Sequence, residues 1–121
     1  MTFADQVQGA VSAHGMWKAR LRQAIESGKS DFKVEVVRQD NQCDFGKWLY
    51  GEAKRDHGQE PQYEKVRALH AEFHAEAARV LGAAVAGKKA EAEAAMGIGG
   101  KFSHTSSSLI TALVLWEKAA A

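Results

Sequence analysis

Residues 61–87, PQYEKVRALHAEFHAEAARVLGAAVAG, have the clearest helical pattern in the chain. Pro61 suits the first position of a helix, where its missing N–H costs no hydrogen bond, and Gly87 suits the position after the last turn. Apolar residues recur between them every three or four positions, as on the buried face of one long helix. These residues are Tyr63, Val66, Leu69, Phe73, Ala77, Val80, Leu81 and Ala84. The stretch predicts a helix long enough to organise a bundle.

Two other stretches repeat this spacing. The first lies near the N-terminus and ends before Gly28, a residue typical of the position after a helix. Its inward face contains Phe3, Val7, Ala10, Val11, His14, Trp17, Leu21 and Ile25. The second begins at Lys88, and its face contains Ala92, Ala95, Met96, Phe102, Leu109, Leu113 and Trp116. Gly97, Gly99 and Gly100 weaken this last helix by ~1 kcal/mol each relative to alanine, so they indicate a kink or a close helix crossing.

Shorter elements are expected between the first two long helices. Residues 32–37 mix β-branched and charged side chains, and without a partner strand they predict a short helix or an extended connection. Asn41 could cap a brief helix over residues 42–50 that ends at Gly51, and a polar loop follows over residues 52–58. We therefore predict one all-α domain over residues 1–121, four-helix-bundle-like, with three long helices plus a short helix that carries the cysteine.

Composition narrows the class of function. The 121 residues include 16 basic and 15 acidic side chains, which leave a formal net charge of +1 and no basic stripe suited to nucleic acid. Apolar runs such as residues 112–116 are too short to span a membrane, and the N-terminus lacks the pattern of a signal peptide. Cys43 is the single cysteine, which excludes an intramolecular disulfide and fits a reducing cytoplasm.

Polar residues that interrupt the inward faces are the candidate site residues. His14 lies near the middle of the first face. His70 and His74 are four residues apart, so their side chains project from one helix face one turn apart. Cys43 falls at the start of the brief helix, where free N–H groups and the helix dipole favour a thiolate over a thiol. Three histidines and one thiolate make the four ligands of a closed tetrahedral zinc site.

The other two histidines fall outside this set. His57 lies in the predicted polar loop, and His104 lies on the face opposite Phe102 and Leu109 at about 100° per residue. Each selected residue also has an ordinary explanation. A buried histidine can be a hydrogen-bonded core residue, a spaced pair can lie on a solvated face, and a lone cysteine can be a core hydrophobe. The combination favours a metal site because the three inward histidines and the cysteine together complete one.

Three motifs carry a family resemblance. His14 is followed three residues later by Trp17, the run CDFGKWLYG covers residues 43–51, and HAEFH covers residues 70–74. With these motifs the chain resembles the chemoreceptor zinc-binding (CZB) domain family. The similarity extends over residues 3–116, and the run at residues 43–51 is its most specific part.

The resemblance implies a fold and a metal. Members of the family bind zinc inside a helical bundle through one histidine, the cysteine and the histidine pair. Within the run, Gly46 permits close approach of another backbone. The three residues after Lys47 either anchor the helix and orient the thiolate or are ordinary core residues, and we favour core packing. Asp44 either favours the helix N-terminus or hydrogen-bonds a ligand histidine, and we favour the first. The implied Zn2+ ligands are His14, Cys43, His70 and His74.

The resemblance also implies a role. Family members look like sensory modules of bacterial chemotaxis receptors and diguanylate cyclases, mostly in the cytoplasm. We therefore expect a cytoplasmic, non-enzymatic domain that senses zinc, or an oxidant that reacts with the zinc-bound thiolate of Cys43. The expected partners are a second copy in a homodimer and a chemoreceptor or diguanylate cyclase, with no nucleic acid and no membrane insertion. No output domain is recognisable, so we expect the signal to leave through a contact with another chain.

Two other classes of function stay open. In a cysteine-based redox enzyme, Cys43 would be the nucleophile and His70 its base, and the thiol would be reactive and free of metal. In a purely structural role, zinc would hold a protein-interaction bundle together without signalling. A His3Cys set with no carboxylate and no open position favours zinc over iron or copper and argues against a hydrolase.

Overall fold

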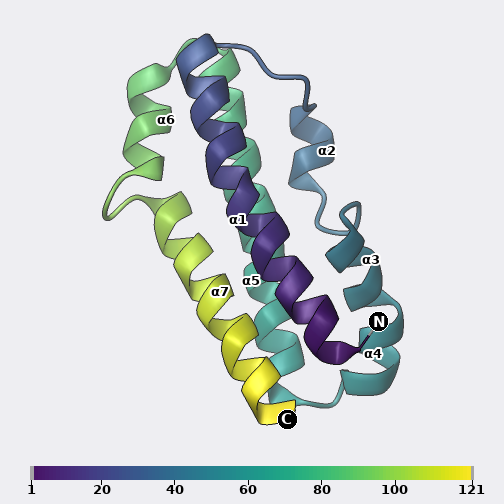
Figure 1. Ribbon diagram of the computed structural model, residues 1–121. Helices are drawn as coiled ribbons and strands as arrows, with labels where there is room; N and C mark the ends of the chain where they lie inside the picture. Colours follow the sequence, from purple (N-terminus) through teal and green to yellow (C-terminus); the bar gives the residue numbers. More distant parts are fainter. Residues whose placement is uncertain (1, 121) are drawn as a thin grey trace.

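Three long helices run side by side: α1 (Phe3–Ser27), α5 (Pro61–Val85) and α7 (Lys101–Ala120) (Figure 1). The structure is a computed structural model that describes residues 2–120, so the two ends of the predicted domain, Met1 and Ala121, lie outside the described residues. A short helix, α6 (Lys89–Met96), extends the column of α7. The fourth column consists of α2 (Val34–Arg38), α3 (Asp44–Tyr50) and α4 (Glu52–His57). The predicted all-α, bundle-like architecture is confirmed.

The first two long helices begin and end close to the predicted positions. Pro61 occupies the first turn of α5, and Gly28 caps the end of α1 with a φ of 72°. The start of α1 has a signal that the sequence prediction missed. Thr2 and Asp5 form a capping box, in which each side chain accepts a hydrogen bond from the backbone N–H of the other. Local periodicity and end signals were therefore sufficient to define these helices.

The C-terminal helix is divided into two, which is more than the predicted kink. α6 ends at Met96 and α7 begins at Lys101. Gly99 has a φ of 82°, in the left-handed region that glycine favours. At Gly100 a Cβ atom would lie 2.3 Å from the carbonyl oxygen of Ala95, so only glycine fits there. The glycines end one helix and start the next because they permit a turn that other residues resist.

Two predictions in the fourth column were wrong. The cap of α3 is Cys43, whose sulfur accepts from the backbone N–H of Gly46, and the helix begins at Asp44. The segment predicted as a polar loop forms α4, because Ala53 is fully buried and holds one face of an otherwise polar segment against the bundle. A single buried residue in six is too weak a pattern to be recognised in the sequence.

The core is centred on α5, which packs against α1, α2, α6 and α7. Its largest fully buried apolar side chains include Trp116, Phe73, Phe102, Leu21, Leu49, Leu81, Leu109 and Leu113. The first turn of α1 and the last turns of α7 meet at the end of the bundle where α4 lies (Figure 1). No helix within residues 2–120 combines the length and apolar character needed to cross a membrane.

Candidate metal centre

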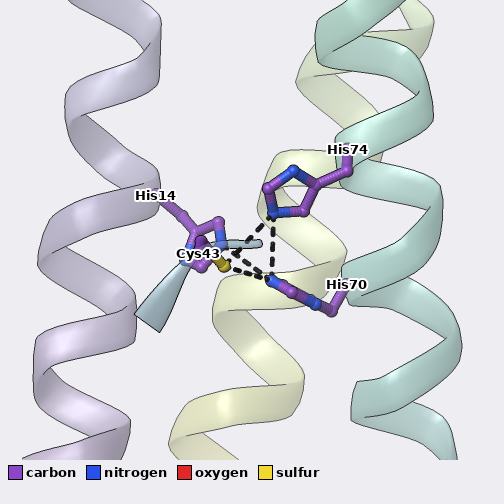
Figure 2. Close-up of side chains that lie close together, drawn as sticks. All are labelled: His14, Cys43, His70 and His74. Atoms are coloured by element: carbon purple, nitrogen blue, oxygen red, sulfur yellow. Dashed lines mark hydrogen bonds between the residues drawn. The ribbon is translucent and has the colours of Figure 1, made fainter. Parts of the chain in front are cut away.

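Four side chains from three parts of the chain point toward one spot inside the bundle (Figure 2). His14 comes from the middle of α1, Cys43 from the N-cap of α3, and His70 and His74 from successive turns of α5. The three histidines are buried, with 2%, 0% and 4% of their surface exposed, and Cys43 is half-buried. The structure therefore brings together all four residues selected from the sequence.

Four of the six distances between the ligand atoms are close to those of a tetrahedral zinc site, and the other two are no longer than 4.8 Å. Nε2 of His70 lies 3.0 Å from Nε2 of His14 and 3.1 Å from Nε2 of His74. Sγ of Cys43 lies 3.4 Å from Nε2 of His70 and 3.6 Å from Nε2 of His74. Ordinary zinc–nitrogen and zinc–sulfur bond lengths in a tetrahedron place two nitrogens about 3.3 Å apart, and a sulfur and a nitrogen about 3.6 Å apart. A metal ion would need little rearrangement of these side chains.

Backbone carbonyl groups orient two of the three rings. Nδ1 of His14 donates to the carbonyl oxygen of Ala10 at 2.7 Å, and Nδ1 of His74 donates to that of Val37 at 2.8 Å. A carbonyl oxygen only accepts, so each Nδ1 carries the proton and each Nε2 keeps a free lone pair directed at the site. Asp44, which is exposed in the first turn of α3, is not the partner of either ring.

His70 is held differently. Its Nδ1 is buried and has no hydrogen-bond partner within the described part of the chain. Its Nε2 faces the Nε2 lone pairs of His14 and His74. In the absence of a cation, Nε2 of His70 must therefore carry a proton, because otherwise three lone pairs would face one another. The arrangement is complementary to a small cation, because a metal at this point would satisfy all three nitrogens at once.

The comparison with protein families agrees with this geometry. Residues 14–81 match the family described as the chemoreceptor zinc-binding domain. This match covers more than half of the chain and includes all four clustered residues. The chain belongs to the chemoreceptor zinc-binding domain family. Comparisons with curated proteins and with solved structures gave no match.

In this zinc-binding domain, burial keeps the clustered histidines neutral. Desolvation, opposed by the bond to Ala10 and assisted by His74, lowers the pKa of His14 to about 4. Desolvation and the nearby His14 and His74 lower the pKa of His70 to about 2. The pKa of His74 is also lowered, mainly by burial. Neutral imidazole is the form that binds metal, so at neutral pH no ring has to release a net proton, although His70 has to carry its proton on Nδ1 instead of Nε2 to bind.

The cysteine behaves differently from the sequence prediction. Burial raises the pKa of the Cys43 thiol, and the backbone N–H groups of Gly46 and Phe45 only partly offset this effect. Without metal, Cys43 is therefore held as a thiol, although it does sit at a helix N-terminus. A bound metal ion reverses this balance, because a coordinating thiol is deprotonated. The environment of the metal-free thiol does not resemble that of a reactive catalytic cysteine, which needs a lowered pKa.

The remaining histidines lie outside the cluster. His104 is exposed on α7, as its position in the pattern predicts. His57 is half-buried at the end of α4, so the prediction of a loop position was wrong. The centroid of its ring lies 4.7 Å from that of Phe3 and 5.9 Å from that of Trp116. Its Nδ1 lies 2.5 Å from Oε2 of Glu60. It belongs to an aromatic cluster at the end of the bundle.

Sequence reasoning missed the groups that hold the ligands in place. The carbonyl oxygens of Ala10 and Val37 have no side-chain signal, although the first is four residues before His14 on the same helix. Phe45 also contributes, since its ring packs edge-on to His14 at 6.0 Å and to His70 at 5.2 Å. These hydrogen bonds and ring contacts restrict the orientations of the three rings, and the buried Phe45 covers one side of the site.

Proposed function

We propose that His14, Cys43, His70 and His74 bind one zinc ion and that the domain is a sensory module of bacterial signalling. The observation that carries the proposal is the convergence of three histidine nitrogens and one Sγ atom, all within 4.8 Å of one another inside the bundle. The set contains no carboxylate and uses four protein ligands. A bound zinc ion would hold Cys43 as a thiolate and tie three separate segments together.

Two inputs suit this site. One is zinc itself, since occupancy links α1, α3 and α5 through the ligand side chains. The other is a hydroperoxide or a similar oxygen-transferring oxidant. The Cys43 thiolate attacks the distal oxygen, an S–O bond forms, the O–O bond breaks, and the leaving oxygen takes up a proton. The sulfenic acid is a poorer ligand than the thiolate, so α3 would lose one of its links to α5.

Measurements of zinc content and thiol reactivity test the proposal. We expect about one zinc per chain in the purified protein, slow reaction of Cys43 with a thiol reagent, and a faster reaction after chelation. Cys43→Ala should lower zinc affinity and abolish zinc release by peroxide. His104→Ala, which alters an exposed histidine outside the cluster, is the matched control and should behave as the wild type.

Each outcome separates the candidate roles. If Cys43→Ala leaves both zinc content and the response to peroxide unchanged, the sensory proposal is wrong. Zinc that neither chelators nor peroxide remove would indicate the structural role. A reactive thiol in a protein that binds no metal would indicate the cysteine-based enzyme. Zinc exchange without peroxide sensitivity would identify zinc as the input.

The same proposal includes a cytoplasmic location and a homodimer that passes the signal to a chemoreceptor or diguanylate cyclase.

The proposed dimer surface lies on α1 and α7. Neither residues 6–17 of α1 nor residues 102–116 of α7 contain a lysine, arginine, aspartate or glutamate. These neighbouring helices also carry three exposed apolar side chains, Met16, Val114 and Leu115, with 53%, 38% and 52% of their surface exposed. An uncharged outer surface on two adjacent helices suits close packing against a second copy. A protein that sediments as a monomer at micromolar concentration would contradict this part.

A further inference from the structure

The turn at residues 39–43, which joins α2 to α3 and ends in Cys43, is folded tightly onto α3. Gly46 makes this possible. A Cβ atom at Gly46 would lie 1.9 Å from the carbonyl oxygen of Asp40, so the backbones of the turn and of α3 are in direct contact. The N–H of Gly46 also donates to Sγ of Cys43 at 3.3 Å. The position of the ligand sulfur therefore depends on how this turn is held.

A side-chain hydrogen bond closes the turn from its other end. The hydroxyl of Tyr50, the last residue of α3, donates to the carboxylate Oδ2 of Asp40. Both side chains are half-buried. Burial and the Asp40 carboxylate raise the pKa of Tyr50, so the phenol keeps the proton that it donates. Arg67, three residues before His70 on α5, also interacts with this hydroxyl and places the bond beside the helix that carries two ligands.

We propose that Asp40 and Tyr50 are positioning residues for the metal centre. Their hydrogen bond keeps the turn closed on α3, so that Sγ of Cys43 stands 3.4 Å from Nε2 of His70 before the ion arrives. This inference rests on the proposed metal site and extends it to residues outside the ligand set. Asn41 and Gln42 in the turn are exposed, so without the bond the turn would gain freedom that metal binding must remove.

Two substitutions separate the hydrogen bond from the charge of Asp40. Tyr50→Phe removes the donor and leaves the carboxylate in place. Asp40→Asn removes the charge and leaves an amide oxygen that can accept from Tyr50. Asn41→Ala, in the same turn with an exposed side chain, is the matched control.

We expect Tyr50→Phe to weaken zinc binding about tenfold, the usual scale for groups that orient metal ligands. Co2+ bound to this variant should show a weaker thiolate-to-cobalt absorption band, and the metal-free thiol should react faster with a thiol reagent. Asp40→Asn should stay close to the wild type in all three measurements because the acceptor is retained. The double variant should bind zinc almost as tightly as Tyr50→Phe does. Any further loss of affinity should be no larger than the small effect of Asp40→Asn alone.

Three results would overturn the inference. One is a Tyr50→Phe protein with wild-type zinc affinity, cobalt spectrum and thiol reactivity. Another is a large loss in Asp40→Asn with little loss in Tyr50→Phe, which would assign the effect to charge. The third is wild-type zinc binding by Asp40→Ala. This variant removes the same hydrogen bond and replaces Tyr50→Phe in the test if Tyr50→Phe fails to fold. A wild-type protein that binds no metal would instead refute the proposed function, while the comparison of metal-free thiol reactivity still tests the turn.

Discussion

Acidification of the metal-free protein should destabilise it through the histidine cluster. A histidine whose pKa is lowered by folding binds fewer protons in the folded state than in the unfolded state. The stability that depends on its neutral form is therefore complete above the unfolded pKa of about 6.5 and is lost as the pH falls below it. The loss ends near the folded pKa, which is about 4 for His14 and about 2 for His70.

The magnitude follows from these two values. Between pH 7.5 and pH 5, His14 and His70 should each reduce the free energy of unfolding by about 2 kcal/mol. The lowered pKa of His74 acts in the same direction. A total of about 4 kcal/mol is a large part of the 5–15 kcal/mol or so that stabilises a typical domain. The physical cause is mainly desolvation, because a protonated imidazole loses its hydration in the buried cluster, and charge on the neighbouring rings adds to the cost for His14 and His70.

Chemical denaturation measures this effect directly. The chelator-treated protein is unfolded in urea at pH 7.5, 6.5, 5.5 and 5.0, and helicity is followed by circular dichroism. We expect a constant free energy of unfolding above pH 6.5 and a steep decline below it. His70→Leu should reduce the decline by about half, whereas His104→Gln, with an exposed ring on α7, should leave it unchanged.

Two results would refute this reasoning. A free energy of unfolding that is the same at pH 7.5 and pH 5 would show that the rings are not buried as neutral groups. A decline of full size in His70→Leu would assign the pH dependence to other residues.

Two further predictions concern the supports of the site. Gly46→Ala should destabilise the protein by about 1–3 kcal/mol and weaken metal binding, because the new Cβ would lie 1.9 Å from the carbonyl oxygen of Asp40 and the turn must move away. Urea unfolding and zinc competition measure both effects. Trp116→Ala should cost about 3–5 kcal/mol, because this fully buried ring packs at the end of the bundle and its Nε1 donates to Glu60 at 3.0 Å; its measure is the midpoint of thermal unfolding.

Each of these two substitutions has a matched control at an exposed position of a helix. Gly9 lies on an open face of α1, and Gly9→Ala should stabilise the protein by about 0.5–1 kcal/mol. Lys118 is two residues after Trp116 and exposed, and Lys118→Ala should change stability by less than about 0.5 kcal/mol. Equal effects in Gly46→Ala and Gly9→Ala, or in Trp116→Ala and Lys118→Ala, would contradict the structural explanation.

Much of the site could be predicted because its ligands interrupt strong helical patterns. His14, His70 and His74 stand on the buried faces of α1 and α5, and the helical period places such residues inward without knowledge of the fold. Cys43 was selected as the single cysteine near a helix start, which is a weaker signal. The sequence predicts Asn41 as the N-cap of the helix that follows, whereas Cys43 is the N-cap of α3. Sequence alone does not show which residue is the last one before the helical conformation begins.

The pKa of Cys43 shows why local reasoning has limits. Its place at a helix N-terminus predicts a lowered pKa, and the N–H groups of Phe45 and Gly46 do act in that direction. Burial against residues distant in the sequence raises the pKa more. Desolvation depends on everything that surrounds a side chain, so it is decided only when the bundle has formed.

The sequence by itself determined the long helices and the identity of the clustered residues, since both follow from spacing and residue type along a few turns. Only the tertiary structure decided how the cluster is held: the carbonyl of Val37 that orients His74, the bond between Asp40 and Tyr50, and the orphaned Nδ1 of His70. Val37 and His74 are 37 residues apart, Asp40 and Tyr50 are 10 apart in different elements, and the Nδ1 of His70 lacks a partner only because of what packs around it. They depend on distance and burial in the packed bundle, which periodicity does not encode.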